Sequence, residues 1–322
     1  MIDMSNTVIA ALSGIFSLLT IASLFVAKFK PTDKKLVARM RSWWVMIVIF
    51  SLAVLAGKYS LITLFIGLSY LGFNEFHRNR MQTSAKLLVK RSAYLAYCLI
   101  ALQYTWIMLD YFFLYQYFIP CTLLILLGLN SILVSTSPLL DHQQFKHFSC
   151  AVLINGYALS HVVLFAFHHP YQLPNNTLVE HALQPYSISL VLYLVFLTQS
   201  NDISQYIWGK SIGKRAVFPK ISPNKTYVGL FGGIGTTLLL SMLIAPWLTP
   251  FSWHWALLSG LLISLSGFTG DILLSSFKRQ FSIKDFSQFI PGHGGVLDRL
   301  DSLVVAAPLF FYFVYTVYPS HR

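Results

Sequence analysis

Long apolar runs are the feature that most constrains what this chain can fold into. Many runs of about 17–23 residues contain almost no charge, and about 20 mainly apolar helical residues cross the hydrocarbon core of a bilayer. A soluble domain carries roughly a quarter charged residues, whereas charged residues make up 11 % of this chain. The sequence therefore predicts an all-α integral membrane protein.

The apolar runs predict about ten transmembrane helices. They lie at roughly 7–27, 43–57, 60–76, 93–109, 112–134, 148–167, 186–208, 228–247, 253–270 and 301–318. If both chain ends lie outside, all of the 23 Lys and Arg residues except Lys58 and Arg322 fall in cytoplasmic loops. That distribution follows the positive-inside bias, so the net charge of +12 reflects membrane topology and nucleic acid is not expected as a partner.

The acidic residues are few, eleven in all, and five of them follow residue 200. Asp202 falls within the predicted seventh span, Asp271 ends the ninth, and Asp301 begins the tenth with Asp298 three residues before it. A carboxylate at membrane depth costs a few kcal/mol and is by default a functional candidate. The alternative for each is a carboxylate at the lipid interface that is solvated or paired with a lysine.

Two basic cytoplasmic segments accompany these carboxylates. The segment 209–227 holds five cations, including Lys214 and Lys225, among glycines and prolines. Glycine lets backbone N–H groups approach phosphate oxygens, and lysine supplies a point charge. The segment 271–300 contains a Pro-Gly-His-Gly-Gly turn, and its cations are Lys278, Arg279, Lys284 and Arg299. Charge alone does not distinguish the first segment from an ordinary positive-inside loop.

This mixture of carboxylates, cations and glycines fits a metal–nucleoside triphosphate. Mg²⁺ takes oxygen ligands, often one or two carboxylates together with substrate phosphates. The predicted topology brings the carboxylates together from the ends of different spans at the cytoplasmic side. We therefore expect Mg²⁺ as the cofactor, with room for a second cation such as K⁺.

The stretch from Ser275 to Asp301 resembles the motif of the phosphatidate cytidylyltransferase (CDP-diglyceride synthetase) family. The matching elements are Ser275, Lys278-Arg279, Lys284-Asp285, Pro291, His293-Gly294-Gly295 and Asp298-Arg299-x-Asp301. The match extends upstream without a gap, so the resemblance covers about residues 200–310. The chain departs from the family pattern at Val228 and Leu274, where the family often has a polar or acidic side chain, and after Asp202, where the family usually has small residues and this chain has Ile203, Ser204 and Gln205.

The resemblance implies cytidylyl transfer from CTP to phosphatidate or a similar anionic lipid, giving CDP-diacylglycerol and pyrophosphate. It implies Asp271 and Asp298 as metal ligands, with Asp301 and Asp202 as further candidates. The implied catalytic residues are Asp271, Asp298, Lys278, Arg279 and His293. The implied substrate-binding residues are Lys225, Ser222, Thr226, Lys284, Arg299 and Lys214. His293 is left open between a phosphate donor or acid and a turn-stabilising residue.

Other readings stay open at this point. Val228 and Leu274 would suit an inactive or altered-lipid homologue. The intramembrane Asp202 and the ten spans would suit a polytopic transporter, although such carriers often show repeated halves and none stands out here. We expect Asp298→Asn to abolish turnover while leaving the protein folded.

The expected organisation is an N-terminal transmembrane bundle at 1–185 and a C-terminal catalytic transmembrane region at 186–322, within one integrated membrane domain. The first run lacks a basic n-region and a small-residue cleavage site, so we interpret it as a membrane helix. The size and short loops favour a bacterial inner membrane, with the active site facing the cytoplasm. A homodimer is compatible with this arrangement.

Overall fold

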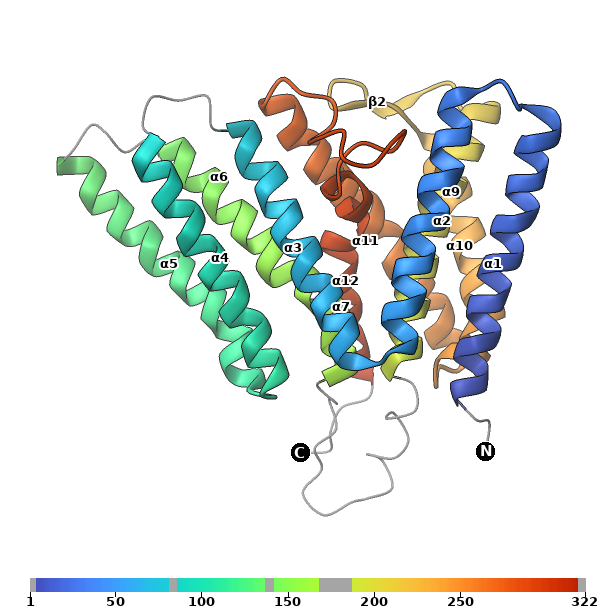
Figure 1. The fold of residues 1–322 in the computed structure, drawn as a ribbon, viewed down its shortest axis with the longest axis horizontal. Coiled ribbons are helices and arrows are strands. Elements are labelled where there is room, and N and C mark those ends of the chain that lie inside the picture. Colours follow the sequence, from blue (N-terminus) through green and yellow to red (C-terminus); the bar gives the residue numbers. More distant parts are fainter. Residues whose placement is uncertain (1–3, 81–85, 137–141, 168–186, 318–322) are drawn as a thin grey trace, which may run out of the picture.

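The structure is a computed structural model that describes residues 4–80, 86–136, 142–167 and 187–317 (Figure 1). Within these residues the chain forms long helical rods and one small β-hairpin. Nine rods are single helices: α1 (Met4–Phe29), α2 (Lys34–Leu55), α3 (Lys58–Arg80), α4 (Lys86–Met108), α5 (Phe112–Thr136), α9 (Ser187–Ile212), α10 (Tyr227–Leu248), α11 (Trp253–Gln280) and α12 (Leu297–Val317). A tenth rod joins α6 (His142–Val152), the π-helical turn η1 (Leu153–Ala158) and α7 (Leu159–Phe167).

Six helical segments of the described chain are long and apolar enough to cross a membrane. They are Asn6–Phe29, Lys34–Leu55, Lys146–Phe167, Tyr227–Leu248, Trp253–Gln280 and Leu297–Val317. Their outward faces carry large apolar side chains, for example Leu24 on α1 and Leu243 on α10, as helices in contact with lipid require. The expected helical membrane-protein character is confirmed, and six of the ten predicted spans are long and apolar enough to cross a membrane within the described residues.

Each predicted span corresponds to one helical rod. The observed helix boundaries differ most from the predicted ones at the end of the molecule that carries the basic segments. Helix α2 begins at Lys34 because the Asp33 carboxylate accepts a hydrogen bond from Leu36 N at 3.0 Å and caps it,. Helix α11 continues to Gln280, beyond the predicted end at residue 270. The apolar pattern marks the membrane-embedded part of a helix, and these helices run on past it.

The segment 209–227, predicted as a loop, contains an antiparallel hairpin of β1 (Ala216–Phe218) and β2 (Ser222–Thr226). Thr226 ends β2 and also caps α10, because its hydroxyl accepts a hydrogen bond from Gly229 N at 3.0 Å,. The all-α expectation therefore needs this one correction. The hairpin brings the residues of β2 to the ends of α9 and α10.

Helix α12 packs against α11, α9, α7 and α3 near the centre of the molecule (Figure 1). The closest approach is at Gly270, where an added Cβ would collide with the backbone oxygen of Asp301. Glycine at this position therefore lets α11 lie directly against α12 beside Asp271. The α1–α2 turn, the β-hairpin and the segment 281–296 all lie at one end of the molecule, whereas α1 begins and α12 ends at the other (Figure 1).

Candidate active site

Three helices each bring one carboxylate to the same region. Asp202 lies on α9, Asp271 on α11 and Asp301 in the first turns of α12, and their charges are close enough to interact with one another. Asp202 accepts a hydrogen bond from Ser302 Oγ at 2.7 Å through one oxygen. Its other oxygen is buried and has no hydrogen-bond partner among the described residues. The sequence-predicted carboxylates therefore do meet, and one retains an unused ligand atom.

Lys225, on strand β2 of the hairpin, forms an ion pair with the carboxylate of Asp271. The Lys225 Nζ–Asp271 Oδ2 distance is 2.5 Å, and both side chains keep some exposure. Ser275 Oγ donates to the other oxygen of Asp271 at 3.1 Å, as expected for positions i and i+4 on one helical face. Lys225, a predicted substrate-binding residue, therefore contacts Asp271, a predicted metal ligand.

Asp298 lies deeper, with its side chain 2 % exposed. Lys278 Nζ is 2.9 Å from one carboxylate oxygen, and the backbone N–H groups of Phe286 and Gly295 donate to the other at 2.9 Å each. Two of these donors hold the segment 281–296 to the start of α12 through this one carboxylate, and the third, Lys278, ties α11 to it. Its role as a metal ligand stays a prediction.

The Pro-Gly-His-Gly-Gly turn is held by α2. Arg39 Nε donates to Gly292 O at 2.9 Å, and Ser42 Oγ donates to Pro291 O at 2.8 Å. Gly294 has φ of +87°, a left-handed conformation that costs glycine little. The His293 ring lies edge-on to Trp43, with centroids 5.8 Å apart. Whether His293 is a phosphate donor or acid, or a turn-stabilising residue, stays a prediction.

The surroundings of His293 lower its pKa to about 4, first through burial and then through the positive charges of Arg299 and Arg39. The folded state therefore disfavours protonation of this imidazole. Its contribution to stability is fully present above the ordinary pKa of about 6.5 and is lost as the pH falls towards about 4. We expect the thermal midpoint in detergent to fall over this window, and to fall less in His293→Gln. An equal fall in both proteins would contradict this assignment.

Glu75, near the end of α3, is a site residue that the sequence analysis did not single out. One carboxylate oxygen accepts from Ser287 Oγ at 2.6 Å and Val296 N at 2.9 Å, and the other accepts from Leu297 N at 2.9 Å. A carboxylate at a helix N-terminus satisfies unpaired N–H groups and the helix dipole. The rule applied to Asp202, an acid inside a predicted span, would also have identified Glu75.

Replacing Glu75 by Gln is expected to lower stability by about 1–3 kcal/mol, because an amide NH₂ group would replace one of the two accepting oxygens. The carboxylate also packs against the Cα of Gly295, where an added Cβ would lie 2.5 Å from Glu75 Oε2. Thermal unfolding in detergent measures the change. Asp33→Asn, which keeps a good capping residue on α2, is the control, and equal midpoints for the two variants would contradict the anchoring role.

The other predicted site residues separate into structural and exposed groups. Arg279 Nε donates to Ile221 O at 3.0 Å, and its guanidinium also donates to Ile283 O at 3.3 Å, so this residue ties the hairpin turn to the segment 281–296. Thr226 is occupied as the cap of α10, and Ser222 lies in the hairpin opposite Phe218. The exposed residues are Lys214 and Lys284.

Besides Lys225, the residues Lys278 and Arg299 place positive charge beside the carboxylates. Lys278 interacts electrostatically with Asp298, Asp301 and Asp271, and Arg299 interacts with Asp202 and Asp301. Arg299 also receives at its backbone oxygen a 3.5 Å hydrogen bond from Gln199 on α9. Cations and carboxylates are therefore interleaved, as a site for a phosphate-bound divalent ion requires.

The donor set fits a cation that is shared with a substrate. In the described part of the chain, no three His, Cys, Asp or Glu side chains form a ready-made metal-binding group. Mg²⁺ does not need one, because it usually takes one or two protein carboxylates and completes its shell with water and phosphate oxygens. The unpartnered oxygen of Asp202 and the partly exposed carboxylate of Asp271 suit that role.

The fold and the site together define a membrane protein in which carboxylates and cations gather at one end of its helices. The chain belongs to the cytidylyltransferase family, whose family model matches residues 37–317. It is 37 % identical to the uncharacterized protein YnbB of Escherichia coli over 94 % of this chain and 97 % of that protein. It is 39 % identical to the phosphatidate cytidylyltransferase of Bacillus subtilis and 40 % identical to that of Haemophilus influenzae. Those two matches span only 42 % and 41 % of this chain, and about half of each enzyme.

Proposed function

We propose that this protein transfers the cytidylyl group of CTP to the phosphate of phosphatidate, giving CDP-diacylglycerol and pyrophosphate. The observation that carries the proposal is the meeting of Asp202, Asp271 and Asp301 with Lys225 and Lys278 at one end of the helices. Family membership supports nucleotide transfer, and the partial likeness to phosphatidate cytidylyltransferases supports the acceptor.

The proposed reaction needs little covalent help from the protein. An oxygen of the lipid phosphate attacks the α-phosphorus of CTP, the bond to the oxygen bridging to the β-phosphorus breaks, and pyrophosphate leaves with that electron pair. Catalysis is then mainly alignment and neutralisation of charge. Asp271 and Asp298, with Asp301 and Asp202 beside them, would hold Mg²⁺, which when bound neutralises charge on the triphosphate.

The lysines have separate parts in this proposal. Lys225 and Lys278 form ion pairs with Asp271 and Asp298. Both lysines would bind the reacting phosphates, and Lys278 would do so from a buried position. The exposed Lys214 and Lys284 would attract CTP at the cytoplasmic surface, where electrostatic steering raises association rates. Arg279 would act mainly by fixing the hairpin against the segment 281–296.

We place the protein in a bacterial inner membrane with ten spans and both chain ends outside. The α1–α2 turn, the hairpin and the segment 281–296 lie at the same end of the molecule (Figure 1). This arrangement supports a cytoplasmic site that CTP and bilayer lipid can both reach. A reporter enzyme fused after Arg322 should therefore read as non-cytoplasmic, and one inserted in the α1–α2 turn as cytoplasmic. A cytoplasmic reading at both positions would contradict the ten-span topology.

The acceptor is tested by offering the purified protein labelled CTP, Mg²⁺ and several lipids in mixed micelles. We expect a CDP-lipid from phosphatidate and none from neutral diacylglycerol, which lacks the attacking phosphate. Product from another phosphomonoester lipid but not from phosphatidate would keep the reaction and replace the acceptor. No product from any phospholipid acceptor would contradict the proposal.

A further inference from the structure

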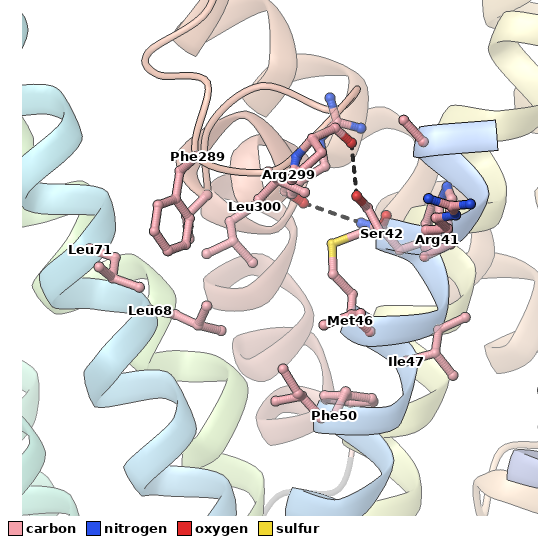
Figure 2. A pocket seen from close by; sticks show the side chains of 18 of the residues that line it. Arg41, Ser42, Met46, Ile47, Phe50, Leu68, Leu71, Phe289, Arg299 and Leu300 are labelled. Atoms are coloured by element: carbon pink, nitrogen blue, oxygen red, sulfur yellow. Dashed lines mark hydrogen bonds between the residues drawn. The ribbon is translucent and has the colours of Figure 1, made fainter. Parts of the chain in front are cut away.

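A cavity of about 980 Å³ lies between α2, α3, α9 and α12, next to the carboxylate cluster but distinct from it. Figure 2 shows its walls, with Met46 and Phe50 on α2, Leu68 and Leu71 on α3, and Leu300 on α12. Along α2 the cavity lining extends from Arg41 to Phe50, which are nine residues apart and therefore separated by about 13 Å at 1.5 Å per residue. The cavity is therefore a long apolar groove running from the site into the membrane-spanning part of the bundle.

The lining of the groove carries positive charge but no negative charge. Its cations are Lys34 and Arg41 on α2 and Arg299 on α12, and no acidic side chain is among the described residues that line the cavity. Arg299 Nε is buried and has no hydrogen-bond partner within the described residues. An unpaired buried donor is costly, and an anionic group bound beside Arg299 would satisfy it.

The groove also opens sideways. Val45 and Ile49 on α2 and Leu71 on α3 line the cavity and are 58 %, 48 % and 40 % exposed. In a helix that crosses a bilayer, such side chains face lipid. A molecule that stays in the membrane can therefore enter between α2 and α3 without passing through water.

We propose that this groove holds an acyl chain of the anionic lipid substrate and that Arg41 and Arg299 bind its phosphate. Apolar walls accept the hydrocarbon, the cationic residues accept the charge, and the lateral opening admits a lipid. A nucleotide would leave most of the apolar wall unfilled. The inference rests on the proposed function for the identity of the lipid, because Arg299 links the groove to Asp202 and Asp301 and places the lipid phosphate beside the reacting centre.

The groove assigns to α2 a role that the sequence motifs do not contain. Arg41 precedes the predicted second span, where it counts as one more positive-inside residue. In the structure it lines the same cavity as Arg299, which follows it by more than two hundred residues. The lipid phosphate would thus be bound by one arginine from each half of the chain, and α2 would select the substrate.

Gly67 offers a way to close the groove. It lines the cavity, and a Cβ added there would meet no other atom within 4 Å, so Gly67→Phe can enter the groove without displacing backbone. Gly235 on α10 has equally open space around it and lies outside the cavity lining. Gly235→Phe is therefore the matched control for adding a large side chain to a helical glycine.

Binding is measured without CTP, using the full-length protein in detergent and phosphatidate with brominated acyl chains that quench tryptophan fluorescence. Trp43 lines the cavity. The difference in quenching between wild type and Trp43→Phe therefore reports occupancy of the groove. We expect Gly67→Phe and Arg41→Gln each to weaken this binding about tenfold or more, and Gly235→Phe to change it less than twofold. Brominated diacylglycerol, which lacks the phosphate, should bind more weakly and should not respond to Arg41→Gln.

The outcomes separate this inference from the proposed function. Absence of Trp43 quenching, or equal binding by wild type and Gly67→Phe, would overturn the groove as the lipid site. Equal binding of phosphatidate by wild type and Arg41→Gln would overturn the phosphate clamp. Binding that follows the expected pattern, without cytidylyl transfer in the presence of CTP and Mg²⁺, would support the lipid site while contradicting the proposed reaction.

Discussion

Replacing Asp271 by Asn is expected to lower CDP-lipid formation at least about a thousandfold and to leave the fold intact. In the proposal this carboxylate holds Mg²⁺ beside the triphosphate, and losing charge stabilisation of about 4 kcal/mol in the transition state corresponds to that factor. Stability should fall less than in a variant of the more deeply buried Asp298, because the Lys225–Asp271 pair keeps 17 % and 21 % side-chain exposure and asparagine removes the repulsion between Asp271 and Asp301.

The measurement compares initial rates at saturating CTP and lipid with thermal midpoints of the same preparations. Asp33→Asn is the matched control, since it makes the same chemical change at the basic end of the molecule. It should retain wild-type rate and midpoint. A rate for Asp271→Asn within tenfold of wild type would remove Asp271 from the metal-binding set.

Asp298→Asn is expected to lose both activity and stability, the latter by about 3–5 kcal/mol. Lys278 and Asp298 form a buried pair at 2.9 Å, and removing one partner of such a pair leaves a buried charge uncompensated. The asparagine would also bring an NH₂ group towards N–H donors at Phe286 and Gly295. The prediction from sequence for this variant names only loss of turnover in a protein that stays folded, and the buried pair adds this loss of stability to it.

A double variant tests the cause of that loss. Lys278→Met with Asp298→Asn removes both charges, so it should recover part of the stability lost in Asp298→Asn. It should not recover activity, because both residues belong to the proposed site. Thermal unfolding of the wild type, the two single variants and the double variant gives the coupling. An Asp298→Asn protein as stable as wild type would contradict the buried-pair account.

The positions of the helical rods could be predicted because their signals are local. A run of apolar residues marks each helix whatever its neighbours are, so the predicted spans and the observed rods agree closely. The hydrogen bond from Ser275 to Asp271 agrees with helical spacing, because the two residues are four apart on α11,. The gathering of Asp202 with Asp271 and Asp301 followed once each was placed at the same side of the membrane.

The contacts between the two halves could not be predicted in the same way. Glu75 binds the start of α12 at Leu297, and Arg39 binds the turn at Gly292, across more than two hundred residues in each case. No periodicity relates such positions, and their pairing depends on how helices pack side by side. The proposed division at residue 185 stays a prediction, although these contacts show that the segment 281–296 and the start of α12 are held in part by α2 and α3.

The most direct test of the central claim follows the phosphates of CTP. Purified protein is incubated with phosphatidate, Mg²⁺ and CTP labelled at either the α- or the γ-phosphate. The account predicts that α-label enters the lipid fraction, that γ-label is recovered as pyrophosphate in equal amount, and that neither occurs without Mg²⁺ or with Asp271→Asn. Intact CTP in the presence of folded protein and phosphatidate, or γ-label in the lipid, would contradict cytidylyl transfer.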